Sequence, residues 1–487
     1  MDTDKIILEK EKIIEQIKHY VPLFARFLDV KDPVNIYSDK LYNFKVSNIH
    51  KTRQGLIKKI LLNKITALFG PDAINQLRVE LEENLSFNIA DHHQILNHPI
   101  LVSSNVISSV SKIQGSRRQS ATIVISSGDV PPNNYFSKSG FQFHGKTVPL
   151  FSANEREYCS YFIPKRDFNF VDRLKNIKRW NVFNESEKNF LDKYQSLVNN
   201  INFESCTNYN DQVSLIVKNT WPLIFEGSVR KRLPELIYIT QEELIAECLK
   251  QILREDNFVS ASLFEENLRN KVINNFRGIV VAWNEKEKKG THFFWRKYPN
   301  EPRSLRMYIQ GNKLVPEDER FKHLSIELKP DIVIELLEKK EIYPSLFTIF
   351  SVLNFYAGVK PLTGYGSTVY LEHFRQAWLK SLENTEYSTE HDLINEVDTT
   401  GFIAGIAIFF GRINEQIRAL YAADIIAQNG MTKEYLDQVF KMEFNKLLSV
   451  ATADLYDYFS QKYIPASEKL SKTITFDDLA AINFDWI

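Results

Sequence analysis

The sequence predicts an α+β fold, or an irregular α/β fold, in which a mixed sheet core is joined to helical N-terminal and C-terminal parts. Apolar residues recur every three or four positions towards both ends of the chain, which is the pattern of amphipathic helices. Short β-branched runs bounded by glycine, serine and proline occur in the middle of the chain. Because 487 residues exceed one ordinary domain, we expect three regions: helical 1–85, a mixed α/β core at 86–326 and helical 327–487.

The N-terminal region is expected to be helical because isoleucines recur at helical spacing among lysine and glutamate between Ile6 and Tyr20. A second helix is expected to reach Phe69, where Gly70-Pro71 ends it. A third helix is expected at 73–83.

The middle region is expected to alternate strands with helices. The expected strands are 122–125, 146–151, 158–162 and 236–239, and the expected helices are 185–200, 213–225 and about 240–254. Thr240 and Glu243 have the spacing of a capping box, which predicts a helix that begins directly after the strand 236–239. Two hairpins are expected, around 284–290 and at Gly311-Asn312.

After Pro330 the pattern is mainly helical. The expected helices are 331–340, 345–356, 369–382, 413–427 and 432–463.

Charge, cysteine content and hydropathy exclude several classes of protein. The chain has 61 Lys and Arg against 61 Asp and Glu, without the basic excess that is usual in nucleic-acid binders, so no nucleic acid is expected as a partner. The three cysteines are far apart and form neither a CxxC motif nor a disulfide framework. The longest apolar run, 402–410, is much shorter than the ~20 residues that span a bilayer, and the N-terminus lacks a signal-peptide pattern. We therefore expect a soluble, cytoplasmic protein without a membrane partner; its oligomeric state is open.

The strongest candidate for a functional segment is Asp91-His92-His93, followed by His98. Three of the ten histidines fall within seven positions. Histidine titrates near neutral pH and binds metals, and Asp91 is suited to orient an imidazole. Two interpretations remain open: catalytic acid–base groups, or histidines that bond to the main chain in a polar turn. A divalent metal on His93 and His98 is a further alternative, although the spacing does not match HExxH.

The letters Asp91-His92-His93 resemble the signature of the DHH phosphoesterases. That family also needs further aspartates at metal spacing, and the sequence does not contain such a set. The phosphoesterase activity is therefore not carried over.

Two loops supply further candidates. Asp129 follows the strand 122–125 and is a candidate second carboxylate, while Asn133 and Asn134 offer hydrogen bonds to a substrate. A plain turn explains the same composition. Further candidates for anion binding are the glycine loop before the helix at 369 and one basic group, namely Gly364, Gly366, Ser367 and Arg230.

Together these features predict a cytosolic enzyme that acts on a small anionic metabolite, phosphorylated or carboxylated, by hydrolysis or group transfer. His92, His93, His98, Asp91 and Asp129 are the expected catalytic groups. The alternative is a non-catalytic binding or interaction protein with a structural histidine cluster. Dinucleotide, Walker A and GxSxG motifs are not present in the sequence.

Overall fold

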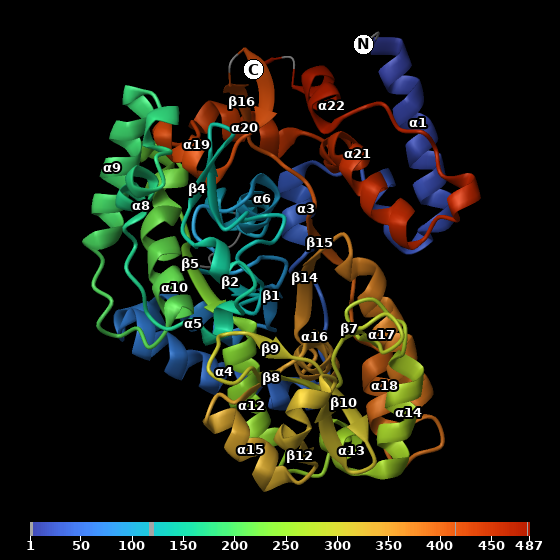
Figure 1. Cartoon of the computed structure of the whole chain (residues 1–487). Helices are drawn as coiled ribbons and strands as arrows, with labels where there is room; N and C mark the ends of the chain where they lie inside the picture. Colours follow the sequence, from blue (N-terminus) through green and yellow to red (C-terminus); the bar gives the residue numbers. More distant parts are fainter. Residues whose placement is uncertain (1–2, 116–120, 414, 485) are drawn as a thin grey trace.

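A computed structural model describes residues 3–115, 121–413, 415–484 and 486–487 (Figure 1). Its centre is a sheet of five parallel strands in the spatial order β15-β14-β1-β2-β5. These strands are β1 (Ser86–Asn88), β2 (Ala121–Ser126), β5 (Glu235–Thr240), β14 (Lys360–Gly364) and β15 (Gly401–Ala404). The α+β or irregular α/β prediction is confirmed, although the main sheet is entirely parallel.

The order of the strands has a consequence for ligand binding. From β1 the chain adds β2 and β5 on one side and later adds β14 and β15 on the other side. The direction of winding therefore reverses between β1 and β14. In open parallel sheets, ligands bind outside the carboxyl ends of the strands at such a switch point.

The sheet is buried on both faces, which explains its continuous apolar runs. Ile123 and Ile125 of β2 belong to one hydrophobic core, while Val124 faces the other core. This alternation follows from the two-residue period of a strand.

The helices form two groups around the sheet (Figure 1). The core on the side of Val124 contains residues of α1 (Thr3–Tyr20), α3 (Val34–Lys40), α6 (Pro99–Ile107), α8 (Phe170–Asn176), α9 (Glu185–Asn199), α10 (Tyr209–Thr220), α19 (Ala422–Ala427), α20 (Lys433–Lys441), α21 (Phe444–Lys462) and α22 (Phe476–Asn483). The core on the side of Ile123 contains residues of α4 (Asn48–Phe69), α5 (Asp72–Glu82), α12 (Gln241–Ile252), α13 (Phe258–Phe264), α14 (Glu266–Phe276), α15 (Pro330–Glu338), α16 (Leu346–Phe350) and α17 (Ser367–Leu382). The shorter helices are α2 (Pro22–Ala25), α7 (Val110–Ile113), α11 (Gly227–Arg230) and α18 (Ser388–Asn395).

Small antiparallel sheets lie outside the main sheet. Their strands are β3 (Gly140–Phe143) with β4 (Lys146–Pro149), β6 (Trp283–Asn284) with β7 (Lys289–Gly290), β13 (Ile342–Pro344) with β8 (Phe294–Lys297) and β9 (Ser304–Leu305), β10 (Met307–Gln310) with β11 (Lys313–Pro316) and β12 (Ile326–Glu327), and β16 (Phe410–Ile413) with β17 (Gln416–Ala419). No helix in the described part of the chain is both long and apolar enough to cross a membrane.

Several predicted elements are wrong. The helix expected at 413–427 is instead the hairpin β16–β17 followed by the short α19, because exposed and half-buried residues alternate along Gln416–Ala419. The strand expected at 158–162 contains a 3-10 turn, and the helix expected at 432–463 is divided into α20 and α21. The capping box at Thr240 does not form, because that side chain makes no cap hydrogen bond.

The three expected regions do not correspond to three separate sheets or bundles. β14 and β15, from 327–487, complete the sheet that begins with β1, β2 and β5 from 86–326. The boundaries at 85 and 326 stay a prediction. The joint sheet places loops from both regions at a single edge, which positions the candidate site.

Candidate functional site

The carboxyl ends of the parallel strands bring polar segments together at one edge of the sheet. The Ser127 N–H donates to the Asp91 carbonyl at 2.9 Å, and the His93 N–H donates to the Ser127 carbonyl at 2.8 Å. The segments after β1 and β2 therefore lie side by side, and the segment after β5 begins α12 next to them. We use the name carboxyl edge for this end of the sheet, where Asp91, His92, His93, Asp129 and Glu242 lie.

Asp91 is fully buried and poised near neutral pH. Its Oδ2 accepts hydrogen bonds from the amides of Asn97 and Asn105, both at 2.8 Å. Its Oδ1 has no partner at hydrogen-bond geometry among the described residues, although the Tyr238 hydroxyl and the His92 N–H lie near enough to the carboxyl group to lower its pKa. Burial raises the pKa of this carboxyl to about 7. A carboxyl group with such a pKa can both donate and accept a proton at physiological pH.

His93 has partners on both ring nitrogens. Nε2 lies 2.8 Å from the Asn210 carbonyl, to which it donates, and Nδ1 lies 2.6 Å from the Ser126 hydroxyl. The ring stacks on Tyr238 with 4.7 Å between centroids. Burial lowers its pKa to about 4, so the ring is neutral. These contacts suit a residue that fixes the neighbouring segments in place.

His92 and His98 lie against the loop 130–139, which follows β2. His92 Nδ1 is buried without a hydrogen-bond partner in the described part of the chain, and its ring meets the Phe136 ring edge-on at 4.7 Å. His98 caps α6 by accepting from the Ile100 N–H, and it packs against Phe136, Tyr135 and Tyr421. Burial lowers the pKa to about 4 for His92 and about 3 for His98.

The described residues do not bring the histidines together as metal ligands. His93 bonds to Ser126 and Asn210, whereas His98 lies among aromatic rings. No group of three or more histidine, cysteine, aspartate or glutamate side chains suited to a metal occurs in the described ranges.

Asp129 and Glu242 form a carboxyl pair, in which Glu242 is fully buried and Asp129 is half-buried. The charge of Asp129 raises the pKa of Glu242, and the Gly128 N–H donates to Glu242 at 2.8 Å. Burial raises the pKa of Asp129 to about 6 and that of Glu242 well above its ordinary value. Two carboxyl groups so close together share a proton.

Glu242 is not among the site residues predicted from the sequence, although the signal for it was present. Glu242 is the second residue of a helix that begins directly at the end of a predicted strand, Leu236–Ile239. The predicted capping box, which does not form, involved the neighbouring Glu243 instead. The Glu243 side chain accepts from Lys64, Asn208 at 2.7 Å and Lys340 at 3.2 Å, so its charge is neutralised by structural partners.

Unpartnered polar atoms concentrate at this edge of the sheet. Buried side-chain atoms without a hydrogen bond among the described residues include Asp91 Oδ1, His92 Nδ1, Gln94 Oε1, Asn97 Oδ1, Asn210 Oδ1, Thr240 Oγ1 and Gln241 Oε1. Most buried polar atoms in proteins have a partner, and a group of exceptions indicates a place where another molecule binds or where chemistry occurs.

The space next to the histidines is small because the loop 130–139 covers it. A cavity of about 20 Å³ is lined by His92, His93 and Asn134, which is room for one water molecule. Asn134 holds the loop in shape, since its amide donates to the Pro131 carbonyl and the Ser137 hydroxyl, both at 2.7 Å. Asn133 is exposed on this loop.

The glycine loop after β14 lies at the same edge but is filled by aromatic rings. A Cβ on Gly366 would meet the Tyr458 hydroxyl at 2.6 Å, and the Ser367 hydroxyl lies 2.6 Å from that of Tyr370. A Cβ on Gly364 would make only ordinary contacts with Ala404. These residues therefore permit close packing next to the switch point.

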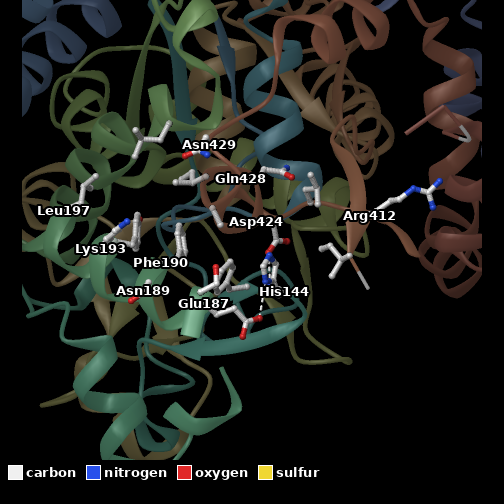
Figure 2. A pocket seen from close by; sticks show the side chains of 18 of the residues that line it. His144, Glu187, Asn189, Phe190, Lys193, Leu197, Arg412, Asp424, Gln428 and Asn429 are labelled. Carbon is white, nitrogen blue, oxygen red and sulfur yellow. Dashed lines mark hydrogen bonds and ion pairs between the residues drawn. The ribbon is translucent and has the colours of Figure 1, made fainter. Parts of the chain in front are cut away.

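Arg230 does not lie at the carboxyl edge. It lines a separate cavity of about 670 Å³. Figure 2 shows His144, Glu187 and Asp424 of the same cavity. The structure thus brings together Asp91, His92, His93 and Asp129, places His98 beside the covering loop, and separates Arg230 from them.

No protein-family model matches the sequence, and no curated protein matches it significantly. The functional conclusion depends on the carboxyl edge itself.

Proposed function

We propose that the protein is an enzyme that acts on a small anionic molecule, phosphorylated or carboxylated, by hydrolysis or group transfer at the carboxyl edge. The observation that carries this proposal is the cluster of unpartnered buried polar atoms around Asp91 and His92. It lies where functional sites of parallel sheets are found, at the ends of strands beside a switch point. Strongly perturbed carboxyl pKa values in the same place are a second support.

The preference for an anion follows from the helices. α6, α12 and α17 all begin close to the carboxyl ends of β1, β5 and β14. Helix N-termini present backbone N–H groups and a positive end of the helix dipole, which favour phosphate or carboxylate.

The acid–base chemistry belongs to Asp129 and Glu242. In the proposed reaction, the ionised member of the pair accepts a proton from water or from an acceptor hydroxyl as that oxygen attacks the substrate. The protonated member donates its proton to the oxygen of the leaving group. One proton is taken and one is given, so the pair returns to its starting charge. His93 keeps the segments after β1 and β2 in position.

The proposed setting is the cytoplasm. Cys159, Cys206 and Cys248 are all free and buried, which fits a compartment that keeps thiols reduced.

A binding protein without catalysis is the second candidate. Two observations favour it: His93 bonds on both nitrogens to the protein, and the cavity beside it holds about one water molecule. In that case the histidines stabilise the edge of the sheet, and partners bind elsewhere on the surface.

Incubation of the purified protein with a protein-free extract of small metabolites separates the two candidates. The wild type is expected to consume at least one phosphate- or carboxylate-bearing compound, detected by mass spectrometry, and Asp129→Asn is expected not to consume it. Asp392→Asn is the matched control, because that side chain is 86% exposed. If wild type and boiled protein leave the same compounds, or if Asp129→Asn is fully active, the enzyme proposal is wrong.

A further inference from the structure

A cavity outside the carboxyl edge, to which no function has yet been given, contains Arg230. Its volume of about 670 Å³ is in the range of small-molecule sites, which is about 300–1,000 Å³. Its walls come from β3 and the turn after it, α9, the segment 223–230, β16 and α19 (Figure 2). Five segments of the chain therefore build one concave surface.

Cations without carboxylate partners line this cavity. They are Lys193, Arg230 and Arg412, and none of them forms an ion pair within the described ranges. Nε of Arg230 donates to the Phe225 carbonyl at 2.6 Å, and Nε of Arg412 donates to the Ile487 carbonyl at 2.9 Å. The main chain thus fixes the base of each guanidinium, and the two terminal nitrogens of Arg230 are left without a partner among the described residues. These two terminal nitrogens of the guanidinium group can bind one phosphate or carboxylate through two parallel hydrogen bonds.

The acidic residues of the cavity are already engaged. Glu187 accepts from His144 Nδ1 at 3.1 Å, from Lys146 at 2.6 Å and from the Asn184 N–H at 2.7 Å. Asp424 accepts the N–H groups of His144 and Tyr421 at 2.7 and 3.0 Å. The charge that remains to be balanced in the cavity is therefore positive.

His144 is held in one orientation. It occupies the β3–β4 turn with φ 45°, followed by Gly145 with φ 74°, which is a type I′ arrangement. Its N–H is bound by Asp424 and its Nδ1 by Glu187, so the ring lies between two buried carboxyl groups (Figure 2). Nε2 has no hydrogen-bond partner in the described part of the chain and is available to a ligand.

The remaining wall is apolar. Phe190, Leu197, Leu223 and Ile413 line the cavity beside the charged groups. A ligand that fits both parts has acidic oxygens at one end and an apolar or ring portion at the other.

We propose that this cavity binds a small organic anion, whose phosphate or carboxylate oxygens are held by Arg230, Lys193 and His144. The site is separate from the carboxyl edge and holds whether or not that edge is catalytic. His98 packs against Tyr421, whose N–H bonds to Asp424, so the two sites are linked by contacts through the start of α19.

Isothermal titration of the full chain with two probes tests the proposal. Sodium pyrophosphate represents the phosphate source and sodium citrate the carboxylate source, both at pH 7 and 0.15 M NaCl. At least one probe is expected to bind, and the tighter one identifies the preferred anion. Arg230→Ala is expected to weaken binding about tenfold, since charge-assisted hydrogen bonds have this order of strength.

Arg232→Ala is the matched control, because Arg232 lies two residues away, is exposed and does not line the cavity. It is expected to change the Kd less than about twofold. His144→Asn is a second variant that retains the turn, since asparagine favours this backbone conformation, and it is expected to weaken binding while the protein stays folded, with a small loss of stability from the missing bond to Glu187. The proposal is overturned if neither probe binds the wild type with a Kd below roughly 10 mM, or if the two arginine variants weaken binding equally.

Discussion

The carboxyl edge of the sheet and the 670 Å³ cavity contain the same residue types, histidines and carboxylic acids, but in different electrostatic surroundings. At the edge, histidines and carboxyl groups are buried without counter-charges, so their pKa values move towards the neutral forms. In the cavity, Glu187 has charged and polar partners that hold its pKa below the ordinary value although burial opposes this. Buried carboxyl groups without charged partners acquire pKa values that suit proton transfer. A buried carboxyl group with such partners, as in Glu187, stays ionised and forms part of a rigid wall for binding.

The largest expected effect concerns Asp91. Because its folded pKa is raised from 3.8 to about 7, the folded state binds a proton more tightly than the unfolded chain. The stability that this carboxyl contributes is complete below about pH 4 and is lost as the pH rises through 7. The difference corresponds to roughly 4 kcal/mol.

Asp91→Asn imitates the protonated form and removes this loss. Urea unfolding of both proteins from pH 4 to pH 8 is expected to show that the variant gains on the wild type by up to that amount as the pH rises. The histidines, with their lowered pKa values, act in the opposite direction in both proteins and cancel in the difference. A constant difference across the pH range would contradict the burial of an uncompensated carboxyl group.

His93 and His92 provide the next comparison. His93→Ala is expected to lower the free energy of unfolding by about 3 kcal/mol, because it removes two buried hydrogen bonds and a stacked ring. His92→Ala is expected to cost less than about 1 kcal/mol, since its Nδ1 has no partner among the described residues. Chemical denaturation measures both. If both variants lose the same free energy of unfolding, the assignment of His93 as a positioning residue and of His92 as a residue free for a ligand is contradicted.

Glu187 tests the wall of the cavity. Glu187→Gln weakens the contacts with Lys146 and His144, and we expect a loss of about 1–2 kcal/mol at pH 7. Because the folded pKa of Glu187 is lowered, the loss should shrink as the pH falls below 4.5 and the wild-type carboxylate is protonated. Thermal melts at pH 7 and pH 4 measure this change, and a loss that grows in acid would refute the ion-pair account.

The smallest effects are expected at the glycine loop. Gly364→Ala should change stability by less than about 0.5 kcal/mol, because a Cβ there meets only Ala404 at ordinary contact distance. Gly366→Ala should cost about 1–2 kcal/mol, because its Cβ meets the Tyr458 hydroxyl. Melting temperatures of the two variants compare them directly, and a reversed order would show that the loop does not pack as described.

Local patterns explain how much of this could be predicted from the sequence. The runs Thr122–Ile125 and Leu236–Ile239 identified β2 and β5, and the histidine segment was found because the residues are adjacent in the chain. The pairing of Asp129 with Glu242 depends on two strands more than a hundred residues apart, which periodicity does not reveal. The same is true of the cavity around Arg230, which His144 and α19 complete. The hairpin β16–β17 was missed because apolar residues spaced for a helix also fit a short strand.

The carboxyl pair at the sheet edge is tested most directly by a ¹³C NMR titration of the side-chain carboxyl carbons, with Asp129→Asn and Glu242→Gln as assignment controls. The account predicts that the Asp129 signal of the wild type titrates near pH 6, with Glu242 well above its ordinary range. If both carboxyl groups titrate independently near pH 4, they share no proton, and the proposed acid–base chemistry at the carboxyl edge is contradicted.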